Sequence, residues 1–254
     1  MRIAIVTGAS SGIGQEFARQ IPRLYKKLDE VWLVARSTDR LKELEKELSV
    51  PVRIFDGDLT RDYIYERIAR ELDRSSCDIR MLVNAAGYGK IGMAEDIDIK
   101  EQSGMIDINC RALTKMTLMC IPHMSRGSRI VQIASAAAFA PQPGFAVYAA
   151  TKSYVYSFAR SLGRELKGKG IVTTVVCPGP VDTAFFEKAG RPEGIMKQTF
   201  MAEPQDVVKK ALTDAAAGRQ ISVFGTAMKA ARAVCRLLPD RLIIAVMMAC
   251  YTKS

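Results

Sequence analysis

The sequence predicts an α/β fold in which a doubly wound, seven-stranded parallel sheet is covered by helices. Short β-rich runs alternate with amphipathic helical stretches along the chain, which is the pattern of βαβ units. Polar or glycine-rich motifs follow several of these runs, as expected when a ligand crevice lies at the carboxyl ends of the strands. The 254 residues are 48% hydrophobic, and no low-complexity linker divides them, so we expect one domain with a helical tail.

The strands are expected where β-branched and aliphatic residues cluster between turn signals. They fall at residues 3–6, 31–35, 52–55, 79–83, 130–134, 171–176 and 221–224. Helices are expected between them at the spacing of three or four residues that places apolar side chains on one face. They fall at 14–28, around 41–48 and 64–72, at 99–119, from Tyr148 to Leu166, and from Pro204 onward. Pro22 lacks a backbone donor, so the first helix should kink or end early there.

Composition limits the function classes. The net charge of +10 is compatible with anionic ligands or membrane surfaces, but no basic run interleaved with aromatics favours nucleic acid. The first strand begins too close to Met1 for a preceding signal peptide, and no apolar run reaches the roughly 20 residues of a membrane span. Six scattered cysteines indicate reduced thiols, and His123, the only histidine, cannot form a metal site alone. We expect a cytoplasmic protein without a metal.

Tyr148 and Lys152 lie four residues apart, so on a helix both side chains face the same way. A cation beside a phenol favours the phenolate and should lower the tyrosine pKa, which suits a general acid/base. Ser135 follows the fifth expected strand, where its hydroxyl could hold a carbonyl oxygen for Tyr148 to protonate.

A glycine-rich turn links the first strand to the first helix, with glycines at positions 8, 12 and 14. Glycines permit a tight turn and let a pyrophosphate approach the backbone N–H groups at a helix N-terminus. The turn is therefore interpreted as a dinucleotide-binding loop.

The spacing Gly-x-x-x-Gly-x-Gly differs from the general dinucleotide fingerprint and resembles that of the short-chain dehydrogenase/reductase family, which has a Rossmann fold. The resemblance extends along nearly the whole chain. It implies that cofactor contacts come from the loop, from the segment after the fourth strand and from the segment after the sixth. These residues are Gly8, Ser10, Ser11, Gly12, Ile13 and Gly14; Asn84, Ala85, Ala86 and Gly87; and Pro178, Gly179, Val181 and Thr183.

The resemblance also implies a catalytic set of Asn109, Ser135, Tyr148 and Lys152. Tyr148 would exchange a proton with the substrate oxygen while Ser135 stabilises that oxygen. Lys152 would also hold the nicotinamide ribose, and Asn109 would link Lys152 to solvent through water. The reaction implied is hydride transfer between NAD(P)(H) and a carbonyl or secondary alcohol.

The tip of the second strand indicates which dinucleotide is used. A carboxylate there suits NAD, whereas an arginine suits the 2′-phosphate of NADP. Arg36 and Ser37 occupy this tip with no acid, which predicts NADP(H). Asp58 and Leu59, after the third strand, resemble the family segment that contacts the adenine; Asp58 is alternatively a helix-terminal acid.

An apolar segment at about 184–203 is expected to form a lid over a lipophilic substrate, steroid- or acyl-like. These side chains could instead pack the sheet edge. A hydroxysteroid dehydrogenase and a 3-oxoacyl reductase both remain open, and the family resemblance implies a homodimer or homotetramer.

Residues 1–225 are expected to form the catalytic unit and 226–254 a basic, amphipathic extension. Lys229, Arg232 and Arg236 share one helical face, with an apolar stripe roughly opposite, and Pro239 separates them from an apolar run at 242–251. That run is too short to cross a bilayer but could lie at a membrane surface. Packing over the cleft or against a second subunit is the alternative.

Two other function classes also bind dinucleotides or nucleotides. A regulatory protein could hold the dinucleotide without turnover, but the complete set of catalytic residues argues against it. A nucleotide-sugar epimerase or dehydratase would need a different glycine spacing and a larger substrate domain.

Overall fold

A computed structural model of the chain describes residues 1–190 and 201–252. Its centre is a seven-stranded sheet in the order β3-β2-β1-β4-β5-β6-β7, in which every neighbouring pair is parallel. The strands are β1 (Arg2–Thr7), β2 (Glu30–Ala35), β3 (Val52–Asp56), β4 (Asp78–Asn84), β5 (Arg129–Ile133), β6 (Val172–Val176) and β7 (Ile221–Ser222). The doubly wound parallel sheet expected from the sequence is confirmed.

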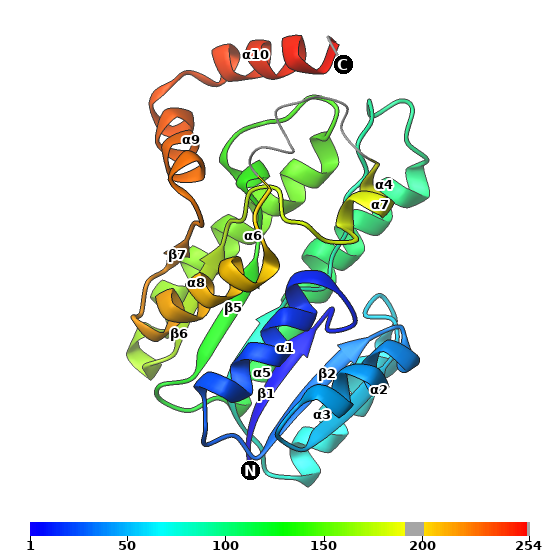
Figure 1. Cartoon of the computed structure of the whole chain (residues 1–254), viewed down its shortest axis with the longest axis vertical. Helices are drawn as coiled ribbons and strands as arrows, with labels where there is room; N and C mark the ends of the chain where they lie inside the picture. Colours follow the sequence, from blue (N-terminus) through cyan, green and yellow to red (C-terminus); the bar gives the residue numbers. More distant parts are fainter. Residues whose placement is uncertain (191–200, 253–254) are drawn as a thin grey trace.

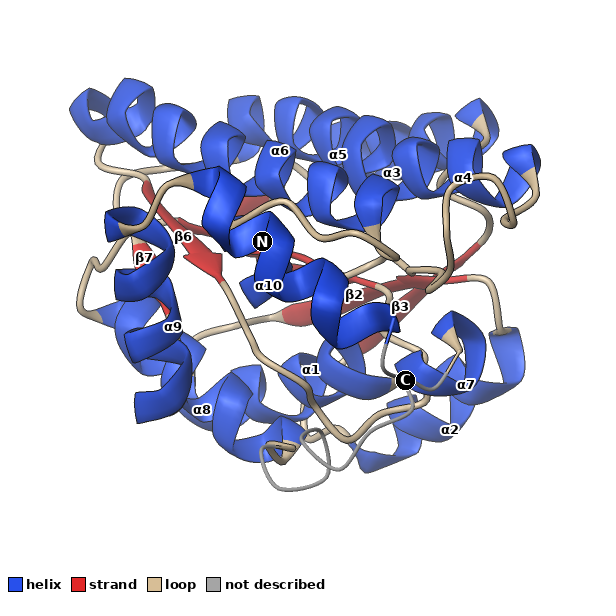
Figure 2. Ribbon diagram, turned by 90° about the horizontal axis from the view of Figure 1, so that it is seen from above, coloured by secondary structure: helices blue, strands red, loops and turns tan. Residues whose placement is uncertain are grey.

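Helices cover both faces of the sheet and form a three-layer structure (Figures 1 and 2). One face is covered by α1 (Gly12–Leu24), α2 (Thr38–Glu47) and α8 (Pro204–Ala216). The other carries α3 (Asp62–Arg74), α5 (Leu113–Cys120) and α6 (Ala146–Glu165). Each layer buries its own apolar cluster against the sheet, because the inner strands are apolar on both sides.

The first helix ends at Leu24, two residues after Pro22, which confirms the expected early end. The long helix expected at 99–119 extends from Ile99 to Cys120, but its middle is not α-helical. Between α4 (Ile99–Ile106) and α5, residues Asp107–Ala112 form a π-helical segment. Such segments are rare and occur often at functional sites. This one contains Asn109.

Two helices follow β7. The first, α9 (Thr226–Leu237), packs beside the 3-10 turn η3 (Ala136–Phe139), and the second, α10 (Asp240–Thr252), follows Pro239. Figures 1 and 2 place α10 across the side of the molecule where the strands end. The helix break expected at Pro239 is thus confirmed. Among the described helices, none is both long and apolar enough to cross a membrane.

Candidate active site

The crevice lies where the strand order reverses. From β1 the chain moves outward to β2 and β3, and then returns to β4 on the other side of β1. The loops after β1 and β4 therefore diverge at their carboxyl ends and leave room for a ligand between them. The segments after β5 and β6 lie along the same edge.

The glycine loop after β1 is held tightly against its neighbours. Gly8 has φ +66°, and a Cβ there would lie 2.8 Å from the backbone of Ala86. A Cβ on Gly14 would lie 2.3 Å from the Gly8 carbonyl oxygen. Larger residues are therefore excluded at both positions. The Ser11 side chain makes no cap hydrogen bond to α1, so the first backbone N–H groups of this helix face the crevice unblocked by it.

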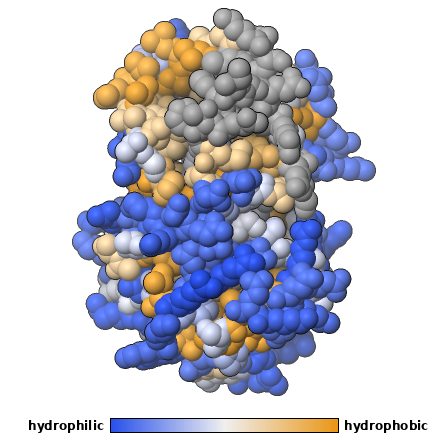
Figure 3. Space-filling view, in the orientation of Figure 1, coloured by the Kyte–Doolittle hydropathy of each residue, from blue (hydrophilic) through white to orange (hydrophobic). Residues whose placement is uncertain are grey.

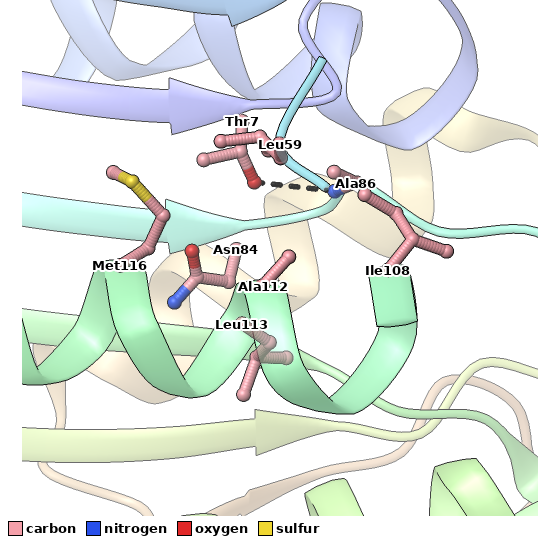
Figure 4. Close-up of a pocket in the computed structure, with 8 residues that line it drawn as sticks. All are labelled: Thr7, Leu59, Asn84, Ala86, Ile108, Ala112, Leu113 and Met116. Carbon is pink, nitrogen blue, oxygen red and sulfur yellow. Dashed lines mark hydrogen bonds between the residues drawn. The ribbon is translucent and has the colours of Figure 1, made fainter. Parts of the chain in front are cut away.

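The loop is fixed to the segment after β4 (Figure 4). The Thr7 hydroxyl accepts hydrogen bonds from the backbone N–H groups of Ala85 and Ala86 at 3.1 and 3.2 Å. Beneath it, the buried Asn84 amide donates to Thr117 at 2.9 Å and to Gln132 at 3.0 Å. The small pocket around Thr7 and Asn84 is otherwise apolar. It is lined by Thr7, Leu59, Asn84, Ala86, Ile108, Ala112, Leu113 and Met116.

Ser135, Tyr148 and Lys152 come together at the end of β5. The Ser135 and Tyr148 side chains share a hydrogen bond. The Tyr148 ring is buried, stacked on Phe145 at a centroid distance of 4.2 Å and tilted against Phe185 at 5.5 Å. The Lys152 ammonium lies 5.5 Å from the centre of the Tyr148 ring. It donates a hydrogen bond to the carbonyl oxygen of Ile133, the last residue of β5, at 2.9 Å.

Burial dominates the protonation of this pair. It raises the pKa of Tyr148 to about 12, although the hydrogen bond from Ser135 acts in the opposite direction. Burial also lowers the pKa of Lys152 to about 8. The expected lowering of the tyrosine pKa is therefore not observed in the protein alone. The reason is that both side chains lie in a low-dielectric environment, which disfavours the phenolate and the ammonium alike.

Asn109 is completely buried in the π-helical segment. Its amide donates to the Tyr88 carbonyl at 2.9 Å and to the Thr151 hydroxyl at 3.0 Å, and its oxygen accepts from the Tyr88 N–H at 3.1 Å. Gly87 is needed beside it, because a Cβ there would lie 2.6 Å from the Asn109 amide oxygen and 3.6 Å from the Lys152 nitrogen. Asn109 and Lys152 therefore approach the same point of the backbone.

The predicted phosphate reader lies at the tip of β2. Arg36 is exposed, and within the described part of the chain it forms no ion pair. Ser37 is the N-cap of α2, and its side chain makes no cap hydrogen bond. One carboxylate oxygen of Asp58 accepts a hydrogen bond from the Thr60 N–H at 2.8 Å and so stabilises the turn that precedes α3.

The segment after β6 completes the crevice. The Pro178 carbonyl accepts a hydrogen bond from the Ala136 N–H at 2.8 Å, which connects this segment to Ser135. Thr183 packs on the glycine loop, where a Cβ on Gly12 would meet its side chain at 3.2 Å. Val181 is buried, and a Cβ on Gly179 would collide with Met228 of α9 at 2.7 Å.

Of the expected lid at 184–203, the part from 191 to 200 lies outside the described residues. The helix α7 (Phe185–Ala189) precedes it, and Phe185 packs on Tyr148.

Comparison with known proteins identifies the family. A family model described as short chain dehydrogenase matches residues 2–194. The chain belongs to this family. It is 31% identical over 215 residues to an uncharacterized oxidoreductase of Staphylococcus epidermidis, covering 84% of this chain and 91% of the relative. A short-chain dehydrogenase from Sphingobium yanoikuyae in complex with NADPH shares 26% identity, with a TM-score of 0.77 over 94% of this chain and 97% of that one.

Two further relatives of this short-chain dehydrogenase have named substrates. A very-long-chain 3-oxoacyl-CoA reductase of Anas platyrhynchos is 35% identical over 191 residues, and 17-beta-hydroxysteroid dehydrogenase type 3 of Mus musculus is 31% identical over 188. Each match covers 71% of this chain and 60% of the relative. The chain is therefore an NAD(P)-dependent dehydrogenase/reductase that spans only part of the length of these two proteins.

Several residues that shape the site of this dehydrogenase were not expected from the sequence. Thr151 lies between Tyr148 and Lys152, donates to the Tyr148 carbonyl at 2.7 Å and accepts the Asn109 amide. Gln132 and Thr117 support Asn84. Gln132 could have been noticed as a polar residue in an otherwise apolar strand. Nothing local in the sequence marks Thr151 or Thr117, since their partners are distant along the chain.

Proposed function

We propose that this short-chain dehydrogenase interconverts a carbonyl and a secondary alcohol with NADP(H), using Tyr148 as general acid/base. The observation that carries the proposal is the buried Tyr148 hydroxyl, hydrogen-bonded to Ser135 and backed by a lysine fixed on the Ile133 carbonyl. A proton donor and an oxyanion donor thus converge at the carboxyl end of β5, as carbonyl reduction requires.

The surroundings of the glycine loop fit a dinucleotide. Side chains are excluded at Gly8 and Gly14, and the N-terminus of the 13-residue α1 opens into the crevice. A pyrophosphate would bind there, with Thr183 closing the loop from the β6 side. When bound, the nicotinamide supplies or accepts the hydride.

The chain's own residues move the proton. In the reductive direction, Ser135 donates a hydrogen bond to the substrate oxygen and Tyr148 donates its proton to the same oxygen. The phenolate that remains is stabilised by the Lys152 ammonium, which stands 5.5 Å from the ring. Phe145 and Phe185 exclude water from the ring and so strengthen these interactions. Asn109 holds the Tyr148 helix in register through Thr151, and a water between Asn109 and Lys152 would return the proton.

The preference for NADP(H) over NAD(H) rests on Arg36. It is exposed at the tip of β2 and is not neutralised by an ion pair within the described residues. The nearby carboxylate of Asp56 is already engaged by Thr38 at 2.9 Å and by Arg67 at 3.2 Å. A guanidinium that is free to form a fork suits a 2′-phosphate. The related dehydrogenase from Sphingobium yanoikuyae is described in complex with NADPH.

The substrate is a lipophilic ketone or secondary alcohol, steroid- or acyl-like. The rings of Phe145 and Phe185 contact Tyr148, and Phe186 packs edge to face on Phe185. The two relatives named for a steroid and for an acyl thioester have substrates of this class. Under this proposal, residues 184–203 form the lid.

The catalytic unit comprises residues 1–225, and 226–254 form an extension that contacts the membrane surface peripherally in a cytoplasmic homodimer or homotetramer. The support for an oligomer is the exposed apolar surface along the long helix and α6. It includes Ile99, Ile106, Leu118 and Tyr154, of which Ile99 is 77% exposed. The support for membrane contact is the apolar surface of α10, where Leu242 is 56% and Val246 63% exposed.

The deciding experiment is oxidation of NADPH and NADH, in parallel, against steroids, 3-oxoacyl thioesters, small aldehydes and sugars. Turnover of lipophilic ketones with NADPH is expected. Tight NADPH binding without turnover of any carbonyl or alcohol would instead favour a regulatory dinucleotide-binding protein.

A further inference from the structure

A second pocket lies outside the dehydrogenase crevice, between η3, α6 and α9. It is lined by Ala138, Phe139, Tyr156, Arg160, Arg232 and Arg236. Three of these six side chains are guanidinium groups, from two helices that are more than 60 residues apart in the sequence. The tertiary fold alone brings them together.

The positive charge of this arginine pocket is not neutralised. Among the side chains that the structure describes, no carboxylate lies within ion-pair distance of Arg160, Arg232 or Arg236. The Nε–H of Arg232 is buried and has no hydrogen-bond partner, although its Nη2 reaches the Tyr156 hydroxyl at 3.3 Å. A buried, unpaired donor on a charged group is costly, so such a group usually marks the place of a missing acceptor.

Aromatic rings form part of the pocket wall. Phe139 and Tyr156 meet edge to face with centroids 6.1 Å apart, and the Arg160 guanidinium lies over the Tyr156 ring at 5.2 Å. Stacking on an aromatic ring restricts a guanidinium and prepares it for a fork-like contact. The cavity has a volume of about 90 Å³, whereas one water needs roughly 10–15 Å³ on the same kind of measure. A small polyatomic anion fits this space.

We propose that the arginine pocket binds a phosphate group. Several guanidinium forks that converge on one small volume match an oxyanion with three acceptor oxygens and up to two negative charges better than a single carboxylate. The Arg232 Nε–H and the Tyr156 hydroxyl supply further donors. This site is separate from the predicted contacts of Arg36 and the glycine loop, because η3, α6 and α9 form it.

The phosphate could belong to a lipid headgroup or to a soluble phosphate ester. The position of the pocket bears on both. It adjoins the C-terminal helices, and Figure 3 shows hydrophobic surface gathered at that end of the molecule, above a hydrophilic body. Leu237, just after Arg236, is 83% exposed. Cationic and apolar side chains in this arrangement are typical of helices that contact anionic bilayers.

Thermal unfolding of the full chain in inorganic phosphate tests the pocket, with sodium chloride at the same ionic strength as the salt control. Binding to the folded state raises Tm, and the rise should saturate. Arg232→Gln should lower the affinity for phosphate about ten- to a hundredfold, which is the usual effect of losing a charge-assisted hydrogen bond. Lys229→Gln is the matched control, because it removes one positive charge from α9 without touching the pocket. It should respond like the wild type.

Arg160→Gln provides a second variant if Arg232→Gln folds poorly, because Arg160 is exposed on the well-packed α6. An equal response of wild type, Arg160→Gln and Arg232→Gln to phosphate would overturn the proposal. Equal stabilisation of the wild type by phosphate and by chloride would also overturn it.

Cosedimentation with phosphatidylcholine vesicles, with and without phosphatidic acid, separates the two sources. Binding that needs phosphatidic acid and is lost in Arg160→Gln and Arg232→Gln, but not in Lys229→Gln, assigns the pocket to a lipid headgroup. A phosphate effect on Tm with no such variant-sensitive vesicle binding assigns it to a soluble phosphate ester.

Discussion

The side-chain amide of Asn109 lies 3.0 Å from the Thr151 hydroxyl, which in turn donates to the Tyr148 carbonyl at 2.7 Å. The π-helical segment is thereby tied to the turn of α6 that carries Tyr148 and Lys152. The position of the proposed acid/base thus depends on a residue more than 30 positions earlier in the chain.

Asn109→Ala should lower both stability and turnover. It removes three hydrogen bonds from a buried site and leaves the backbone N–H and carbonyl of Tyr88 without their partner, at about 1–3 kcal/mol for each buried polar group that loses its partner. Urea unfolding measures the loss. Thr151→Val removes one of these bonds and the bond to the Tyr148 carbonyl but leaves both bonds to Tyr88, and it should cost less. If the two variants were equally stable, the hydrogen bonds to Tyr88 would contribute nothing to the free energy of unfolding.

Tyr148→Phe should reduce kcat by about two to four orders of magnitude, because it removes the proton donor while the ring still fills its place between Phe145 and Phe185. NADPH affinity, measured by fluorescence titration, should change little. Turnover near the wild-type level would contradict the role of Tyr148.

Carbonyl reduction should slow as the pH rises above about 8, where Lys152 loses its proton. The lysine pKa is lowered by burial, so its ammonium is present below this value and lost above it, and the phenolate left by proton donation then lacks its counter-charge. The profile of kcat/KM against pH measures this fall in rate, which forms the alkaline limb of the profile. Lys152→Met should show a low rate without this limb. A limb that persists in that variant would belong to another group.

Arg36→Gln should lower the affinity for NADPH about ten- to a hundredfold and leave the affinity for NADH nearly unchanged, because only NADPH carries the 2′-phosphate. Isothermal titration with each dinucleotide measures the difference. Arg23→Gln, an exposed arginine in the last turn of α1, is the charge-matched control. Equal losses for both dinucleotides would mean that Arg36 reads no phosphate.

Asp214→Asn should destabilise the protein by about 1–3 kcal/mol at neutral pH, because the buried carboxylate binds Lys210 and Arg219 from the last turns of α8 and the loop beyond. Burial raises the pKa of Asp214, but hydrogen bonds from Lys210 and Ser222 outweigh this and hold it below its usual range. The folded state therefore favours the carboxylate, and the stabilisation disappears as the pH falls through the lowered pKa. Guanidinium unfolding at neutral and acidic pH should show the difference between variant and wild type shrinking in acid.

The alternation of strands and helices predicted the doubly wound parallel sheet, because parallel strands buried on both faces must be apolar and must be linked by crossovers. The Pro22 end of α1 and the Pro239 break were predictable for the same local reason, the missing backbone donor. The family was equally evident from motifs that follow individual strands, since each motif is local.

Other features were not local. Nothing in the local sequence indicates that Asp107–Ala112 becomes π-helical, or that Thr151 and Thr117 are buried partners of Asn109 and Asn84. Tyr148 and Lys152 were correctly placed on one helical face, yet the direction of the tyrosine pKa was wrong, because desolvation depends on the rings of Phe145 and Phe185 that close over it.

The tail illustrates the same division. From its sequence alone, α9 presents Arg232 on a basic face opposite an apolar stripe that includes Met228 and Val234. In the structure Met228 packs on Gly179 and Arg232, one turn later, turns inward to Tyr156, while Val234 is 49% exposed. Periodicity determined that this segment is a helix. Only the packing of η3 and α6 against this helix decided which face is buried. The helix buries the face whose side chains fit those of its neighbours.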